Sequence, residues 1–178
     1  MDSTQVDGLR VGSIQPACSG GRLPLNAQYL PQSILVLCEG NHCRSPIAEG
    51  LLRAELGSGI RIESAGLAAT EGTPPHPEAV RLMAEHGIDI RDHRSRQVTP
   101  AMALAAELIL VMDEGQRTWC GSMVPSALGR IQLLGCWLPP GSRMIEDPFG
   151  REPEAFSAAF DLIRRSVRCW KKHLYPSA

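Results

Sequence analysis

The segment with the clearest chemical potential covers residues 38–46 and reads CEGNHCRSP. It begins with Cys38, and Arg44 follows after five intervening residues, just before a predicted helix. A loop of this length can curl so that successive backbone amides converge on one point and hold a phosphate dianion. A thiolate beneath that point is placed to attack phosphorus. The spacing therefore predicts a cysteine nucleophile that acts on a phosphate ester.

Arg44 and the loop backbone define the predicted surroundings of the sulfur. A guanidinium presents a planar fork of donors to two phosphoryl oxygens, and a lysine cannot reproduce that geometry. Converging amides, a helix N-terminus and this positive charge all favour the thiolate of Cys38 over its thiol. We expect Gly40 and Asn41 to supply the left-handed backbone that such a loop needs.

Other residues of the loop have more than one interpretation. The hydroxyl of Ser45 either donates to the thiolate or caps the helix, and one serine can do both. Cys38 and Cys43 lack the C-x2-C spacing of a zinc site, and the adjacent cation of Arg44 opposes a metal dication. No Gly-Lys-Ser/Thr follows, which excludes a nucleotide-binding phosphate loop. A strand-to-helix turn with an incidental cysteine is the simplest alternative.

A phosphate monoester also needs a proton donor for its leaving oxygen, and we looked for one on a loop distant in sequence. Asp147, in the sequence EDPFG, is the best candidate. Asp-Pro alone is a common turn. In combination with the cysteine loop, it predicts a general acid at Asp147.

Short apolar runs predict the strands that carry these loops. The first run is apolar at successive positions, which is typical of a strand buried on both faces of a parallel sheet. Helical segments separate the runs, and this alternation predicts a doubly wound α/β domain. The predicted strands cover residues 33–38, 60–64, 108–112 and 131–134. The predicted helices cover residues 46–56, 77–86, 100–105, 114–123 and 152–173.

The last predicted helix has an apolar stripe and a basic face. The stripe should pack on the sheet. The basic face suits an acidic partner, but cations near a helix C-terminus also suit the helix dipole, and a solvated face is the commoner explanation. The stripe consists of Phe156, Phe160, Ile163, Val167 and Trp170, and the basic face of Arg164, Arg165, Arg168, Lys171 and Lys172.

Length and composition predict one soluble domain. The chain has 178 residues, and its formal net charge of -1 gives no global field that would attract nucleic acid or an anionic membrane. The longest apolar stretch, residues 102–112, is about half a bilayer span, so no membrane insertion is expected. The N-terminus resembles no export signal, which predicts a cytoplasmic protein whose six cysteines are mostly free thiols.

The domain organisation follows from the same composition. Residues 1–32 are rich in Gly, Ser, Pro and Gln and are predicted to form a flexible N-terminal arm. Residues 33–174 form the globular domain, and residues 175–178 are a short tail.

Four motifs resemble those of the low-molecular-weight protein-tyrosine phosphatases. They are VLCEGNHCRSPIAEGLL, SAG at residues 64–66, ILVMDE at residues 109–114 and DPFG at residues 147–150. The resemblance covers about residues 34–174, with the motifs in matching order. It implies a four-stranded parallel sheet of flavodoxin-like order, and neither a metal nor another cofactor. The implied reaction is hydrolysis of phosphotyrosine through a phosphocysteine.

The resemblance also implies roles for individual residues. Cys38 is the nucleophile, Arg44 the phosphate clamp and Asp147 the general acid. Asn41 and Ser45 shape the loop and stabilise the thiolate. The rest of the phosphate-binding loop consists of Glu39, Gly40, His42 and Cys43.

Supporting roles are implied for three further positions. His93 helps to hold the loop asparagine, although a surface or core histidine is an equally simple interpretation. Cys43 forms a protective disulfide with Cys38 under oxidation, or is a small packed residue. Phe149 forms a wall for the phenyl group of the substrate, or is a core aromatic.

Glu39 and His42 replace residues that are often apolar in the family, which predicts a polar mouth that favours peptides with basic flanks.

The stretch SAGLAATEG and the pair Phe149-Gly150 resemble bacterial members encoded with polysaccharide export systems. The implied partner is a phosphotyrosine protein, namely an autophosphorylated bacterial tyrosine kinase, and a monomer is favoured. An arsenate reductase of the same fold is an alternative, but it needs relay cysteines, and Met112-Asp113 occupies the position where the relay would begin. A non-catalytic phosphotyrosine-binding module would need neither Cys38 nor Asp147.

Overall fold

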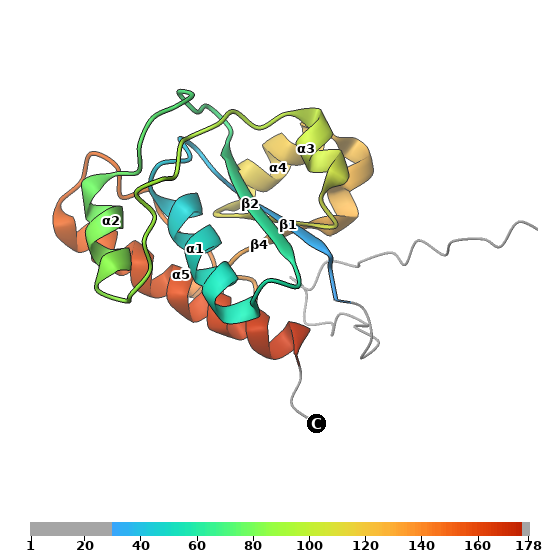
Figure 1. Ribbon diagram of the computed structural model, residues 1–178. Coiled ribbons are helices and arrows are strands. Elements are labelled where there is room, and N and C mark those ends of the chain that lie inside the picture. Colours follow the sequence, from blue (N-terminus) through green and yellow to red (C-terminus); the bar gives the residue numbers. More distant parts are fainter. Residues whose placement is uncertain (1–29, 176–178) are drawn as a thin grey trace, which may run out of the picture.

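The computed structural model describes residues 30–175 (Figure 1). The predicted arm, residues 1–32, and the predicted tail, residues 175–178, therefore lie almost entirely outside the described residues.

Four parallel strands form one sheet in the order β2-β1-β3-β4. β1 (Ser33–Cys38) lies between β2 (Arg61–Gly66) and β3 (Leu108–Val111), and β4 (Ile131–Leu133) pairs with β3. Every residue of β1 is buried, as expected for a central strand that is covered on both faces. The predicted α/β fold with flavodoxin-like strand order is confirmed.

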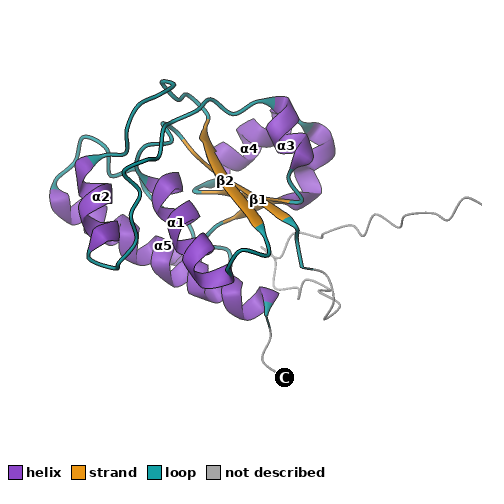
Figure 2. Ribbon diagram, in the orientation of Figure 1, coloured by secondary structure: helices purple, strands orange, loops and turns teal. Residues whose placement is uncertain are grey.

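Helices enclose the sheet from both sides (Figure 2). α1 (Arg44–Leu56), α2 (Pro77–Ala84) and α5 (Pro153–Leu174) pack together on one face. α3 (Pro100–Ala105) and α4 (Glu114–Met123) cover the other face. Between residues 30 and 175, none of the helices has the length and apolarity to cross a membrane. Two 3-10 helices, Pro125–Arg130 and Pro140–Ser142, complete the described elements.

The apolar stripe of α5 is buried, as predicted, and anchors the helix to the core. The indole Nε1 of Trp170 donates a hydrogen bond to the carbonyl oxygen of Leu134 at 2.8 Å, just beyond β4. On the basic face, Lys171 pairs with Glu55 of α1 and Arg164 pairs with Asp161 of α5, so two of its cations have partners within the chain.

Some element bounds differ from the prediction. α1 begins at Arg44, two residues before the predicted start at Pro46, so the arginine belongs to the helix. β2 extends to Gly66 because its pairing with β1 continues until Gly66 lies opposite Cys38. α2 ends at Ala84 rather than at His86, and the chain then turns through Gly87, whose φ angle is 74°.

Candidate active site

The loop between β1 and α1 brings the predicted nucleophile and the predicted phosphate clamp together. Cys38 is the last residue of β1 and Arg44 is the first residue of α1, and both are buried. None of the backbone amides of residues 39–43 donates a hydrogen bond to another described residue. Free amides next to a helix N-terminus attract anions. The loop therefore provides an anion site next to the Cys38 sulfur.

Two residues of the loop meet different backbone requirements. Among the described residues, Asn41 alone combines a side chain with a positive φ angle, 55°. Gly40 is not in the left-handed region, so that part of the prediction is wrong. A Cβ atom at Gly40 would instead collide with the ring of His42. A side chain at position 40 would therefore displace the His42 ring, whereas position 41 needs a residue that tolerates a positive φ angle.

A hydrogen-bond chain leads from Asn41 to the sulfur. The Oγ atom of Ser45 lies 2.9 Å from Sγ of Cys38, and Nδ2 of Asn41 donates to that Oγ at 2.9 Å. The backbone amide of Arg96 donates to Oδ1 of Asn41 at 3.0 Å, which fixes the orientation of the side-chain amide. Because Ser45 accepts from Asn41, its own proton is available to Cys38. This arrangement stabilises a thiolate.

The same contacts decide between the two interpretations of Ser45. The N-cap of α1 is Cys43, and no side chain caps the helix. Ser45 is the second residue of α1, and its hydroxyl is bonded to Asn41 and Cys38. The capping interpretation is therefore wrong, because the hydroxyl is committed to the sulfur.

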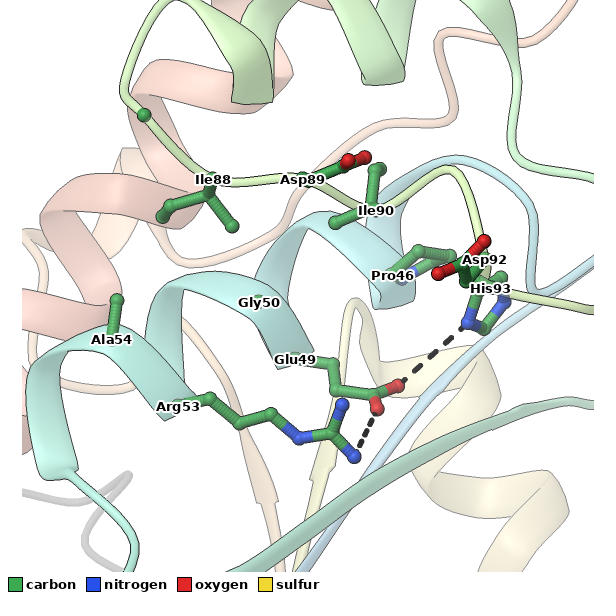
Figure 3. Close-up of a pocket in the computed structure, with 11 residues that line it drawn as sticks. Pro46, Glu49, Gly50, Arg53, Ala54, Ile88, Asp89, Ile90, Asp92 and His93 are labelled. Carbon is green, nitrogen blue, oxygen red and sulfur yellow. Dashed lines mark ion pairs between the residues drawn. The ribbon is translucent and has the colours of Figure 1, made fainter.

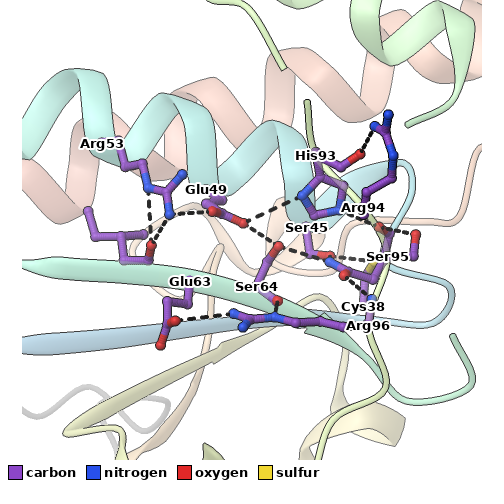
Figure 4. Close-up of polar contacts among 12 residues, drawn as sticks. Cys38, Ser45, Glu49, Arg53, Glu63, Ser64, His93, Arg94, Ser95 and Arg96 are labelled. Atoms are coloured by element: carbon purple, nitrogen blue, oxygen red, sulfur yellow. Dashed lines mark hydrogen bonds and ion pairs between the residues drawn. The ribbon is translucent and has the colours of Figure 1, made fainter. Parts of the chain in front are cut away.

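The polar network continues away from the sulfur (Figure 4). Nδ2 of Asn41 also donates to Oγ of Ser64 at 2.8 Å, and Ser64 donates to the carboxylate of Glu49. Glu49 pairs with Arg53 at 2.6 Å and faces Nδ1 of His93 at 4.0 Å. The sequence patterns around Ser64 and Glu49 predict no role for either residue. The SAG motif contains Ser64, but nothing in the motif indicates its partner.

Two side chains donate hydrogen bonds to the backbone of Asn41. Its carbonyl oxygen accepts hydrogen bonds from Nε2 of His93 at 2.8 Å and from Oγ of Ser95 at 2.7 Å. The structure thus places the predicted His93 against the loop asparagine. Ser95 and Arg96 were not predicted, and they lie in the polar run DHRSRQ, which has no recognisable spacing.

A cavity of about 620 Å³ lies between α1 and residues 87–93 (Figure 3). It shares Glu49 and His93 with the network around Asn41. No cysteine or serine lines it, so the candidate nucleophile belongs to the loop and not to this larger cavity.

Arg44 and Asp147 meet although they are 103 residues apart. Nη2 of Arg44 pairs with the carboxylate of Asp147, and Nη1 donates to the carbonyl oxygen of Ile145 at 2.9 Å. The Nε atom of Arg44 is buried without a hydrogen-bond partner among the described residues. The arrangement places a cation that can bind phosphate next to a carboxyl group that can accept or donate a proton.

Phe149 lies at the mouth of the loop. Its side chain is 60% exposed, so the core-aromatic interpretation is wrong. Its ring meets the imidazole of His42 edge to face at 5.0 Å between centroids. A second cavity of about 380 Å³ opens here, and its lining includes Gly40, His42, Pro75 and Phe149. These rings form one wall of a site next to the anion-binding loop.

Cys43 differs from a reactive cysteine. Burial, assisted by the charges of Cys38 and Asp147, raises the pKa of its thiol from 9.0 to about 12, and only Arg44 opposes this rise. Cys43 therefore stays protonated near neutral pH. The predicted disulfide between Cys38 and Cys43 stays a prediction.

Comparison with known proteins agrees with this geometry. Residues 33–177 match the family described as low molecular weight phosphotyrosine protein phosphatase. The chain is 42% identical over 139 residues to the "Probable low molecular weight protein-tyrosine-phosphatase EpsP" of Ralstonia nicotianae. That alignment covers 78% of this chain and 93% of EpsP.

Solved structures give the same result. The tyrosine phosphatase Wzb of Escherichia coli K30, in complex with sulphate, is 34% identical with a TM-score of 0.76, over 80% of this chain and 98% of Wzb. Wzb of Vibrio vulnificus, in complex with benzylphosphonate, is 35% identical with a TM-score of 0.75, over 79% and 97% of the two chains. The chain therefore belongs to the low molecular weight protein-tyrosine phosphatases, a family of cysteine-dependent hydrolases.

Proposed function

We propose that residues 38–45 form the phosphate-binding loop and that the protein hydrolyses phosphotyrosine through a phosphocysteine on Cys38. One observation carries this proposal. The hydroxyl of Ser45 lies 2.9 Å from the Cys38 sulfur, while Arg44, the preceding residue, pairs with the distant Asp147. A nucleophile, a phosphate clamp and a proton donor thus converge at one loop.

In the first step, the sulfur of Cys38 attacks phosphorus, and the bond from phosphorus to the tyrosyl oxygen breaks. Asp147 gives its proton to that oxygen, so tyrosine leaves as a neutral phenol. Arg44 and the loop amides hold the phosphoryl oxygens and stabilise the charge that develops on them.

In the second step, Asp147, now a carboxylate, takes a proton from a water molecule. The water oxygen attacks phosphorus, the sulfur-phosphorus bond breaks, and phosphate is released. Cys38 leaves as a thiolate, which the hydroxyl of Ser45 stabilises. No further electron donor or acceptor is required.

The mouth of the loop suits an aryl ester. The ring of Phe149 and the imidazole of His42 lie edge to face next to the second cavity, and a phenyl group can pack against them. The benzylphosphonate complex of the related Wzb supports this placement, because its ligand combines a phenyl ring with a phosphonate.

The proposed physiological partner is an autophosphorylated tyrosine kinase of a bacterial polysaccharide export system, which the protein meets as a cytoplasmic monomer. Similarity to EpsP and to Wzb, together with the SAGLAATEG stretch, supports this pathway. The polar residues Glu39 and His42 at the mouth support selection of peptides with basic flanks.

The test is hydrolysis of p-nitrophenyl phosphate with EDTA present throughout. Cys38→Ser should abolish turnover, because a hydroxyl is a far weaker nucleophile than a thiolate. Asp147→Asn should lower kcat by about 10²- to 10⁴-fold, the usual contribution of a general acid. Cys120→Ser, at another buried cysteine, and Asp161→Asn, at an exposed aspartate, are matched controls that should keep wild-type rates.

A wild-type protein that does not hydrolyse p-nitrophenyl phosphate would contradict the proposal. Reduction of arsenate in a parallel assay would then favour the reductase, and tight binding of a phosphotyrosine peptide without turnover would favour a binding module. Full activity of Cys38→Ser would equally exclude the phosphocysteine.

A further inference from the structure

Asn41 is the residue on which the loop geometry depends. Its side chain orients Ser45 toward the sulfur, while its backbone has a φ angle of 55°. Residues with a Cβ atom adopt this conformation at an energetic cost, so the surrounding structure must hold it in place.

Two donors from outside the loop hold the carbonyl oxygen of Asn41. Ser95 is 2% exposed and donates through Oγ at 2.7 Å, and His93 donates through Nε2 at 2.8 Å. A carbonyl oxygen only accepts, so Nε2 must carry a proton for the second bond to exist. The serine hydroxyl can donate at every pH, whereas the imidazole depends on its protonation and tautomer.

The second ring nitrogen of His93, Nδ1, competes with Nε2 for the proton. The carboxylate of Glu49 faces Nδ1 at 4.0 Å, Arg53 pairs with that carboxylate, and Asp89 and Asp92 line the same cavity. A doubly protonated ring can serve both Glu49 and Asn41. A neutral ring has one proton, and when that proton is on Nδ1 the bond to Asn41 is lost.

We propose that Ser95 is a positioning residue that holds Asn41, and through it Ser45 and Cys38, independently of the protonation of His93. This inference rests on the proposed phosphatase reaction and adds a residue that acts through the loop. Removing Ser95 leaves His93 as the remaining side-chain donor to the carbonyl oxygen of Asn41. The geometry of the nucleophile then depends on whether Nε2 of His93 carries a proton.

The experiment compares Ser95→Ala, His93→Gln, Ser95→Ala/His93→Gln and Ser95→Ala/His93→Ala from about pH 5.5 to about pH 9, which spans the titration of histidine. Gln keeps a donor near the position of Nε2 but does not titrate in this range. The matched control is Ser166→Ala, because Ser166 is another buried serine that donates to a backbone carbonyl oxygen at 2.7 Å. Two readouts are used, namely kcat for p-nitrophenyl phosphate and the rate at which iodoacetamide alkylates Cys38.

Relative to wild type, Ser95→Ala should keep near-normal rates at the acidic end and lose about 5-fold at the alkaline end, the value of one net hydrogen bond. Ser95→Ala/His93→Gln should lose this alkaline sensitivity. Ser95→Ala/His93→Ala should be slower than Ser95→Ala/His93→Gln at every pH, because no side-chain donor to the carbonyl oxygen of Asn41 remains. Ser166→Ala should follow the wild-type profile throughout.

The proposal is overturned if Ser95→Ala follows Ser166→Ala at every pH, or if His93→Gln leaves the alkaline loss of Ser95→Ala unchanged. Circular dichroism of each variant shows whether it is folded, and alkylation is scored only on folded protein. Failure of the proposed phosphatase reaction can be told apart from failure of the Ser95 proposal. If only the reaction fails, the wild-type protein is inactive on the ester, but the alkylation rates still differ between Ser95→Ala and Ser166→Ala.

Discussion

Cys38 and Cys43 lie at the two ends of one short loop, and their surroundings differ. Cys38 receives a hydrogen bond from Ser45 at the end of β1. Burial, followed by the negative groups of Cys38 and Asp147, raises the pKa of Cys43 to about 12. Proximity to a helix N-terminus therefore does not activate a thiol when burial and neighbouring charge oppose ionisation.

Alkylation should separate the two cysteines. At pH 7, iodoacetamide should modify Cys38 in the folded protein and leave Cys43 unmodified, because the pKa of about 12 leaves almost no thiolate at Cys43. Peptide mass spectrometry after a short pulse measures both sites. In 6 M guanidinium chloride both should react alike, and equal labelling of the two cysteines in the native protein would contradict the assignment.

The raised pKa of Cys43 also affects stability. The folded state favours the protonated thiol of Cys43. The contribution of Cys43 to the free energy of unfolding is therefore complete below pH 9.0, the pKa of the unfolded chain, and is lost as pH rises from 9.0 toward about 12. At neutral pH, Cys43 adds no pH dependence to unfolding.

At the scale of elements, α2 has an N-cap that depends on pH. The backbone amide of Glu78 donates to Nδ1 of His76 at 3.2 Å, so that nitrogen must be unprotonated, and the His76 ring stacks on Phe156 of α5 at 4.4 Å. Burial lowers the pKa of His76, and the charge of His42 lowers it further. The cap therefore operates when the ring is neutral.

Acidification should weaken this cap. The pKa of His76 is lower in the folded protein than its ordinary value of 6.5, so the unfolded chain binds the proton first. The contribution of His76 to the free energy of unfolding is complete above about pH 6.5 and declines as pH falls through that value. Urea unfolding at pH 7.5 and pH 5.5 measures the decline. His76→Asp, which keeps a capping acceptor, should show a smaller difference, and an unchanged difference would exclude His76 as its source.

The sequence was sufficient for elements with strong local patterns. α3 and α4 have the predicted bounds, because Thr99 and Asp113 each cap the helix that follows with a side-chain hydrogen bond. Apolar runs also located all four strands. The contacts of Ser95, Arg96 and Ser64 with Asn41 were not predictable, because they form only after distant segments come together on the β2 side of the sheet. Polar residues in loops carry no periodicity that would indicate such partners.

At the scale of the molecule, α5 closes one face of the sheet, and Trp170 lies in its last two turns. Trp170 is 2% exposed, and its indole donates to Leu134 at 2.8 Å. Trp170→Phe should lower the free energy of unfolding by ~1–3 kcal/mol, because a buried carbonyl oxygen loses its donor. Trp170→Ala should cost ~3–5 kcal/mol through the cavity it creates. Urea unfolding measures both values.

The same variants test whether stability and catalysis are separable. For folded Trp170→Phe, kcat should equal the wild-type value, because Trp170 contacts neither the loop nor Asp147. A large loss of kcat without loss of structure would show that packing of α5 controls the site.

The pairing of Arg44 with Asp147 has a consequence for synthesis on the ribosome. Arg44 emerges 103 residues before its partner, which corresponds to roughly 5–20 s at about 5–20 residues per second. β3, which flanks the strand that ends at Cys38, also emerges after that strand. During this interval the nascent chain contains the cysteine and, once residue 111 has emerged, the flanking strand, but not Asp147, the proposed proton donor. The enzyme therefore becomes competent only when translation is nearly complete.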